Sequence, residues 1–175
     1  MLFRSIGFTS PERSEGRTSI VLTLAQVLVS DEVRILLVDA DFENPDLADQ
    51  LGLTASVGLW EVVTGRATLE QALQPLSEGG LCLLPLTSFV SPADLNQEQA
   101  RLKSVLRHAR DRFDLLLVDA GPIQCDYGIE DLWIRGCLDA MVTVSSARKR
   151  NHQTAEFVHW QQIGVESLGI IETFA

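Results

Sequence analysis

Short apolar runs alternate with helix-like segments along the whole chain, and this alternation limits the possible folds more than any other feature. Most of the runs are continuously apolar, as strands covered on both faces require. They lie at Leu2–Phe8, Val33–Val38, Leu81–Pro85, Asp114–Val118, Leu138–Val144 and Ser167–Ile171. The sequence therefore predicts an α/β fold with a parallel sheet.

Helical patterns occupy the intervals between these runs. The helix that starts at Pro92 has the clearest signals, because Ser91 can cap it and proline in the first turn loses no hydrogen bond. The predicted helices are Thr18–Ser30, Asp46–Leu51, Gly58–Val63, Leu69–Leu73, Pro92–Arg112, Gly128–Arg135 and Asn151–Ile163.

A length of 175 residues with 46% apolar residues predicts one globular domain over residues 1–175 and excludes low-complexity classes. The first residues break into proline and charges before a signal peptide could form, and no apolar run approaches about 18 residues. We therefore expect a cytoplasmic protein that is neither exported nor inserted into a membrane.

A formal net charge of −10 disfavours nucleic acid and anionic lipid surfaces as partners. The chain has three cysteines, Cys82, Cys125 and Cys137, which show neither CxxC spacing nor a neighbouring histidine pair. The sequence therefore predicts neither a disulfide framework nor a zinc site.

The segment after the first predicted strand, SPERSEGRTS, leads directly into a helix. This strand–loop–helix order is typical of a phosphate-binding P-loop, in which backbone N–H groups and the helix N-terminus converge on phosphate oxygens. The pattern G-x-x-x-x-G-K-[ST] is broken twice, because Pro11 replaces the first glycine and Arg17 the lysine. The residues predicted to bind nucleotide are Ser14, Glu15, Gly16, Arg17, Thr18 and Ser19.

Two further predicted strands end in acids, with Asp39 and Asp41 after one and Asp119 after the other. Ligands of open α/β sheets collect at the carboxyl ends of strands. Carboxylates there can hold Mg²⁺, and one can orient an attacking water. We expect Thr18, Asp41 and Asp119 to form a magnesium site, with Asp39 as the catalytic base.

The order and spacing of six segments resembles the MinD/ParA-type P-loop ATPases, and is most similar to the branch of bacterial tyrosine kinases (BY-kinases) and capsule chain-length regulators. These segments are SPERSEGRTS, ILLVDADFENPDLADQLGL, GLWEVVTGRATLEQALQP, LCLLPL, SPADL and FDLLLVDAGPI. The resemblance covers nearly the whole chain. It implies a single P-loop NTPase-like domain with a doubly wound, mostly parallel sheet, and Mg²⁺ and ATP or ADP as cofactors where the site functions.

Several residues depart from the family pattern. Arg17 replaces a lysine that contacts phosphates, and Glu43 replaces a cation that the family carries after its aspartates. The last strand reads GIIET where relatives tend to have an asparagine that contacts adenine. Tyr127 is the one tyrosine, whereas BY-kinases carry a tyrosine-rich tail.

Three hypotheses follow. In the first, the chain is a degenerate nucleotide-binding protein with weakened or lost ATPase activity. It would regulate exopolysaccharide, capsule or other envelope assembly through a protein partner such as the cytosolic part of a membrane polysaccharide-assembly protein, which would hold it at the inner membrane. In the second, it is a Mg²⁺-dependent ATPase in which Arg17 is catalytic in place of lysine. In the third, it is an interaction module that binds no nucleotide. All three hypotheses are compatible with a homodimer.

Overall fold

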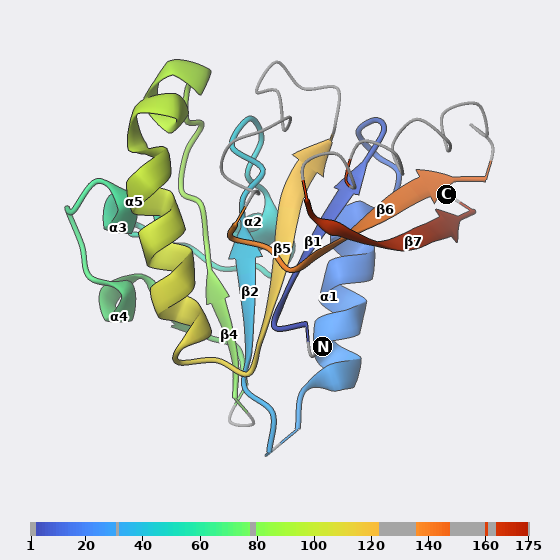
Figure 1. The fold of residues 1–175 in the computed structure, drawn as a ribbon. Helices are drawn as coiled ribbons and strands as arrows, with labels where there is room; N and C mark the ends of the chain where they lie inside the picture. Colours follow the sequence, from blue (N-terminus) through green and yellow to red (C-terminus); the bar gives the residue numbers. More distant parts are fainter. Residues whose placement is uncertain are drawn as a thin grey trace.

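The computed structural model describes residues 3–30, 32–77, 80–122, 136–147, 160 and 164–174. These residues form a seven-stranded sheet in the order β3-β4-β2-β5-β1-β6-β7 (Figure 1). Every pairing is parallel except that of β3 with β4. The predicted α/β class with a doubly wound, mostly parallel sheet is confirmed.

The strands occupy most of the predicted apolar runs, with boundaries shifted by a few residues. They are β1 (Ser5–Ser10), β2 (Ile35–Asp39), β3 (Gln74–Pro75), β4 (Leu81–Leu84), β5 (Leu115–Pro122), β6 (Ala140–Ser146) and β7 (Glu166–Thr173).

The helices of the described residues agree with the sequence patterns to within a few residues. They are α1 (Arg17–Leu28), α2 (Leu47–Gln50), α3 (Leu59–Val63), α4 (Leu69–Ala72) and α5 (Pro92–Arg110). The Ser91 hydroxyl caps α5 by accepting the Asp94 N–H at 3.2 Å, as predicted. The predicted helix at Gly128–Arg135, and all of Asn151–Ile163 apart from the buried Trp160, lie outside the described residues.

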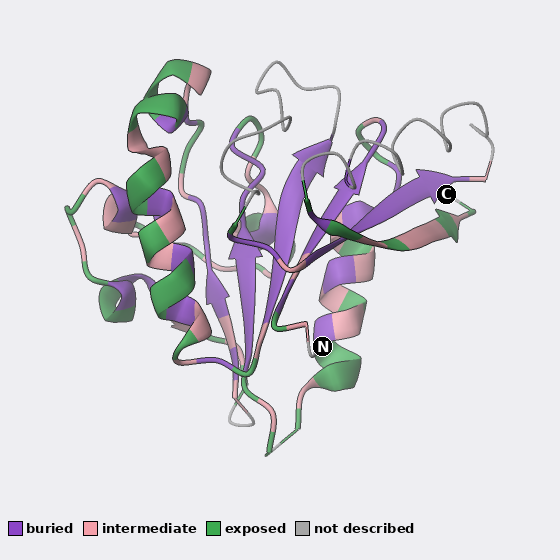
Figure 2. Ribbon diagram, in the orientation of Figure 1, coloured by how far each residue is buried: buried purple, intermediate pink, exposed green. Residues whose placement is uncertain are grey.

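Alternate residues of the central strands point to opposite faces of the sheet, so the core has two halves. On β2, Leu36 and Val38 belong to the cluster beneath α3, α4 and α5, whereas Ile35 and Leu37 belong to the cluster beneath α1. Figure 2 shows the central strands buried over most of their length, with exposed residues on the outer sides of the helices. Burial on both faces explains the continuously apolar runs.

Two details differ from the sequence prediction. The short strand β3 was not predicted; its Gln74 and Pro75 pair antiparallel with β4 at the edge of the sheet, where proline is tolerated. Strand β5 continues past Val118 because, after a bulge, Ser10 of β1 pairs with Pro122. Asp119 therefore lies inside β5 rather than after it.

No helix within the described ranges is both long and apolar enough to cross a bilayer.

Candidate functional site

The loop between β1 and α1 has the backbone conformation of a phosphate-binding turn. Ser14 and Gly16 both adopt positive φ angles, of 62° and 83°, and α1 begins immediately afterwards at Arg17. Alternation of left-handed and helical residues turns successive N–H groups toward one side. The predicted strand–loop–helix arrangement is therefore present, although the glycine of the usual pattern is missing at Pro11.

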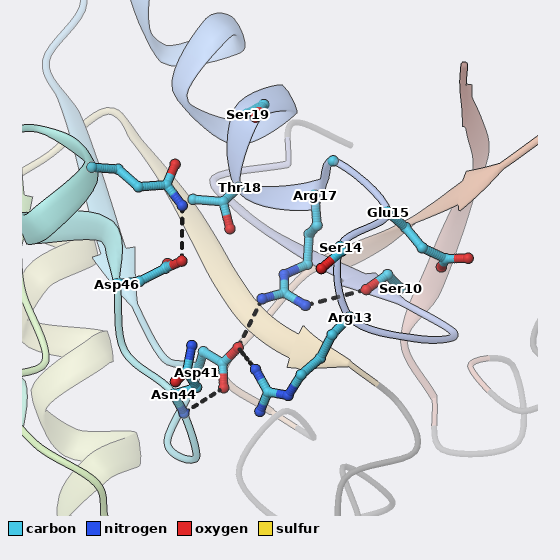
Figure 3. Close-up of a pocket in the computed structure, with 12 residues that line it drawn as sticks. Ser10, Arg13, Ser14, Glu15, Arg17, Thr18, Ser19, Asp41, Asn44 and Asp46 are labelled. Atoms are coloured by element: carbon cyan, nitrogen blue, oxygen red, sulfur yellow. Dashed lines mark hydrogen bonds and ion pairs between the residues drawn. The ribbon is translucent and has the colours of Figure 1, made fainter. Parts of the chain in front are cut away.

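Arg17, at the position where the motif has lysine, binds two acids of the chain itself. Figure 3 shows its contact with one of them, Asp41. Its Nη2 lies 2.8 Å from Oδ2 of Asp41, and its Nε donates to Oδ1 of Asp119. Nη1 donates to the Ser10 hydroxyl at 3.2 Å. With the Arg17 side chain only 8% exposed, this is a buried ion-pair cluster.

The three predicted magnesium ligands do lie together, but their oxygens are already engaged. Thr18 Oγ1 donates to Oδ2 of Asp119 at 2.7 Å, and the other oxygen of Asp119 accepts from Arg17. Asp41 accepts from Arg17 and from the Asn44 backbone N–H. A divalent cation between these carboxylates would meet a guanidinium in the same place, so the site as folded does not fit Mg²⁺.

Asp39, the predicted base, is buried at the end of β2 and binds backbone. Its two oxygens accept the N–H groups of Asp41 at 3.2 Å and Leu47 at 3.1 Å, so it shapes the turn that leads into α2. Burial, and secondarily the neighbouring charge of Asp119, raise the pKa of Asp39 to about 8. At neutral pH this carboxyl is mostly protonated. Its role as a base stays a prediction.

The acid at position 43 has a cation opposite it. Nη2 of Arg13 binds Oε2 of Glu43, and Nη1 of the same guanidinium lies 3.4 Å from Oδ2 of Asp41. The anion that replaces a cation in the family pattern is therefore paired with a cation from the phosphate loop. Arg13 and Arg17 both contact Asp41, which lies between them.

A cavity of about 360 Å³ at the N-terminus of α1 is bordered by Arg13, Arg17, Thr18 and Asp41, among other residues (Figure 3). All six predicted nucleotide-binding residues border it, Ser14, Glu15, Gly16, Arg17, Thr18 and Ser19. The side chain of Glu15 points away from the Arg17 cluster in Figure 3 and is only 2% exposed. Its Oε2 accepts the Glu12 N–H at 3.2 Å, and no group of the described residues donates to its Oε1.

The residues that the sequence did not predict for the site include Ser10, Arg13 and Thr173. The Thr173 hydroxyl at the end of β7 donates to the Glu15 carbonyl at 2.8 Å, and its methyl group lies 3.3 Å from the Cβ position of Gly16. No local pattern marks Thr173, because the contact joins residues far apart in sequence. The reversed charge at Glu43 could have pointed to a compensating cation such as Arg13.

Burial raises the pKa of Asp119, and the positive charge of Arg17 opposes that rise. The guanidinium thus opposes the effect of burial on the Asp119 carboxyl.

The arrangement of the sheet, the loop and the helices is that of the MinD-like P-loop fold. The kinase domain of the Escherichia coli tyrosine kinase ETK superposes with a TM-score of 0.84 and 21% identity over 97% of this chain and 67% of that one. The septum site-determining protein MinD of Pyrococcus horikoshii, solved with Mg-ADP, gives a TM-score of 0.76 at 21% identity, covering 97% of this chain and 69% of that one.

In sequence, the chain is similar to the tyrosine-protein kinase YwqD of Bacillus subtilis, with 27% identity over 156 residues. That alignment covers 87% of this chain and 64% of YwqD, so the chain spans less than two thirds of the kinase. No protein-family model matches the chain. The predicted resemblance to BY-kinases and MinD/ParA-type ATPases is confirmed.

Proposed function

We propose that this chain is a degenerate P-loop protein whose nucleotide site is closed by its own ion pairs, and that it regulates envelope polysaccharide assembly through a protein partner. The observation that supports the closure is the pairing of Arg17 with Asp41 and Asp119. A lysine at this position is free to reach phosphates, whereas this guanidinium is committed to two acids of the sheet.

Nucleotide binding would have to overcome several losses. The ion pairs of Arg17 would break, leaving buried carboxylates without a partner, which is costly in a low-dielectric interior. Pro11 has no N–H to offer a phosphate oxygen. Because the net charge is −10, the protein also repels a polyanionic ligand at long range.

Calorimetric titration with Mg·ATP and Mg·ADP tests the closure. We expect no binding, or a dissociation constant weaker than about 1 µM, corresponding to about −8 kcal/mol. Tighter binding that is lost in Thr18→Ala would contradict the proposal. Arg17→Lys serves as the matched variant: because Arg17 pairs within the chain, we expect this change to restore little nucleotide affinity while weakening the cluster.

The second candidate is a Mg²⁺-dependent ATPase that uses Arg17. The proximity of Thr18, Asp41 and Asp119 favours it, since Thr18 hydrogen-bonds to Asp119 and Arg17 pairs with both acids. It requires the guanidinium to leave both carboxylates when nucleotide arrives. Steady-state phosphate release from the wild type that disappears in Arg17→Lys would identify this function and rule out a closed site.

The partner is proposed from the similarity to bacterial tyrosine kinases, as the cytosolic part of a membrane polysaccharide-assembly protein. If the chain regulates assembly without hydrolysing ATP, polysaccharide assembly should depend on the presence of the protein and not on an intact nucleotide site. We expect deletion of the gene in its host to change the amount or length of surface polysaccharide, and a chromosomal Thr18→Ala variant to leave both unchanged. A Thr18→Ala variant that reproduces the deletion would favour the ATPase instead.

A further inference from the structure

We propose that the Arg17 guanidinium is a resident cation that takes the place of a divalent metal between Asp41 and Asp119, so that the site neither needs nor binds Mg²⁺. This inference extends the proposed closed site by assigning a chemical role to the group that closes it. Mg²⁺ accompanies the nucleotide in the structurally similar MinD, and the acids that would hold such an ion are retained here.

The burial of the two acids makes a cation necessary. Asp41 is 3% exposed and Asp119 is 1% exposed; Asp41 follows the end of β2, and Asp119 lies in the neighbouring strand β5. Two ionised carboxylates in so little water would destabilise the fold unless a positive charge lay between them. Arg17 supplies that charge permanently, from the first residue of α1.

The geometry of the guanidinium suits this role. Its Nε, Nη1 and Nη2 donate to Asp119, Ser10 and Asp41 respectively, so a single planar group engages three oxygens from three strands or strand ends. Arginine keeps its charge at every pH that a folded protein meets, and its donors are held in a rigid fork. An ammonium group has neither the span nor the fixed directions to do the same.

The hydrogen bond of the Thr18 hydroxyl is also compatible with a site that holds no metal ion. In a magnesium site of the kind that the sequence predicted, this oxygen would face the metal. Here the hydroxyl donates a hydrogen bond to Oδ2 of Asp119 at 2.7 Å. Both oxygens of Asp119 are thus satisfied by Arg17 and Thr18 without an ion.

Removal of the resident cation should expose a latent metal site. In Arg17→Met, Asp41 and Asp119 would face each other with the Thr18 hydroxyl nearby, which is an oxygen set that Mg²⁺ or Mn²⁺ accepts while retaining water ligands. The variant should be less stable than the wild type in EDTA and should regain stability when the metal is added. The wild type should show neither effect.

Thermal unfolding of the full chain, in EDTA and at increasing MgCl₂ or MnCl₂ without nucleotide, tests the inference. We expect the wild-type Tm to stay constant and that of Arg17→Met to rise by about 5 °C or more once the metal exceeds its dissociation constant about 100-fold. Arg110→Met is the matched control, because it removes an arginine that pairs with Asp139 at 3.0 Å, away from the cavity. Its Tm should fall without a metal response.

If Arg17→Met does not fold, the metal responses of Arg17→Lys and Arg17→Gln test the same inference. Arg17→Lys retains a charge and should respond to metal less than a foldable Arg17→Gln does. A metal-dependent rise in the wild-type Tm that is lost in Asp119→Asn would overturn the inference, as would equal metal responses in Arg17→Gln and Arg110→Met.

Nucleotide titration in EDTA separates this inference from the proposed function. Tight ATP binding that is equal in EDTA and in Mg²⁺ would contradict the closed site and still support a resident cation. Tight binding that requires Mg²⁺ would contradict both.

Discussion

The hydroxyl of Thr173, at the end of β7, donates a 2.8 Å hydrogen bond to the carbonyl of Glu15 in the loop between β1 and α1. The contact joins the end of the edge strand β7 to the turn before α1, across 158 residues of sequence. The edge strand β7 therefore helps to set the conformation of the loop between β1 and α1.

The first prediction concerns this hydrogen bond. Thr173→Val keeps the shape of the side chain and removes the donor, so we expect a loss of about 1 kcal/mol in the free energy of unfolding. Urea denaturation measures it. Thr23→Val is the control, since the exposed Thr23 hydroxyl donates to the Ser19 carbonyl within α1. If Thr23→Val loses as much stability as Thr173→Val, the hydrogen bond from β7 contributes no more than an exposed hydrogen bond within a helix.

The second prediction concerns the ion pairs of Arg17. Arg17→Met leaves two buried acids without a cation, and we expect a loss of about 3 kcal/mol in stability at pH 7 in EDTA. At about pH 4 the loss should be smaller, because the acids can then take up protons. Chemical denaturation at both pH values measures the two losses. A loss that is the same at both would mean that packing of the side chain, not charge, is responsible.

The third prediction concerns Asp39. Its pKa of about 8 in the folded protein lies above its ordinary value of 3.8, so the folded state holds a proton that the unfolded state has released between these pH values. Stability contributed by this group is therefore lost as the pH rises from about 4 to about 8. In Asp39→Asn this part of the pH dependence should disappear.

The same substitution has a cost at the lower end of that range. Asparagine offers one oxygen for the two N–H groups of Asp41 and Leu47, so the variant should be less stable than the wild type by about 1 kcal/mol at pH 5. Because the wild type loses about 1.4 kcal/mol per pH unit in this range and the variant does not, the two stabilities should become equal and then change order between pH 5 and pH 8. Parallel curves for the two proteins would show that Asp39 is ionised throughout.

The fourth prediction concerns Gly58, which precedes α3. A Cβ atom there would lie 2.1 Å from the Pro85 carbonyl oxygen, a backbone atom that accepts the Leu59 N–H. We expect Gly58→Ala to cost about 2–3 kcal/mol, since the backbone must shift. Gly65→Ala, with φ of 73° and open space around its Cβ position, should cost about 1 kcal/mol. The reverse order of stability would contradict the contact.

The fifth prediction concerns kinase activity. The single tyrosine, Tyr127, lies outside the described residues, and we expect no tyrosine phosphorylation when the purified chain is incubated with Mg·ATP. Intact mass spectrometry measures it. A gain of one phosphate that is absent from Tyr127→Phe would restore the kinase hypothesis.

Much of the fold followed from the sequence because its signals are local. Continuous apolar runs such as Ile35–Val38 indicate strands buried on both faces, and Ser91 with Pro92 mark the start of a helix. The edge strand β3 did not follow, since two residues carry too little pattern and their pairing with β4 depends on the rest of the sheet.

The composition of the candidate site was also readable in the sequence, since strand ends with acids and a loop before a helix are sequential features. Thr18, Asp41 and Asp119 lie close together in the structure, and magnesium binding by them stays a prediction. The direction of the Arg17 side chain could not be predicted from the sequence, because the same guanidinium could point toward a phosphate or toward the sheet.

The sequence by itself determined the kind of sheet, the order of its helices and the residues available at the strand tips, because periodicity and neighbouring residues carry this information. Only the tertiary structure decided that Arg17 binds Asp41 and Asp119, that Arg13 pairs with Glu43 and that Thr173 holds the loop. Each of these contacts joins distant segments, and its strength depends on burial and distance. Those two quantities exist only once the chain has folded.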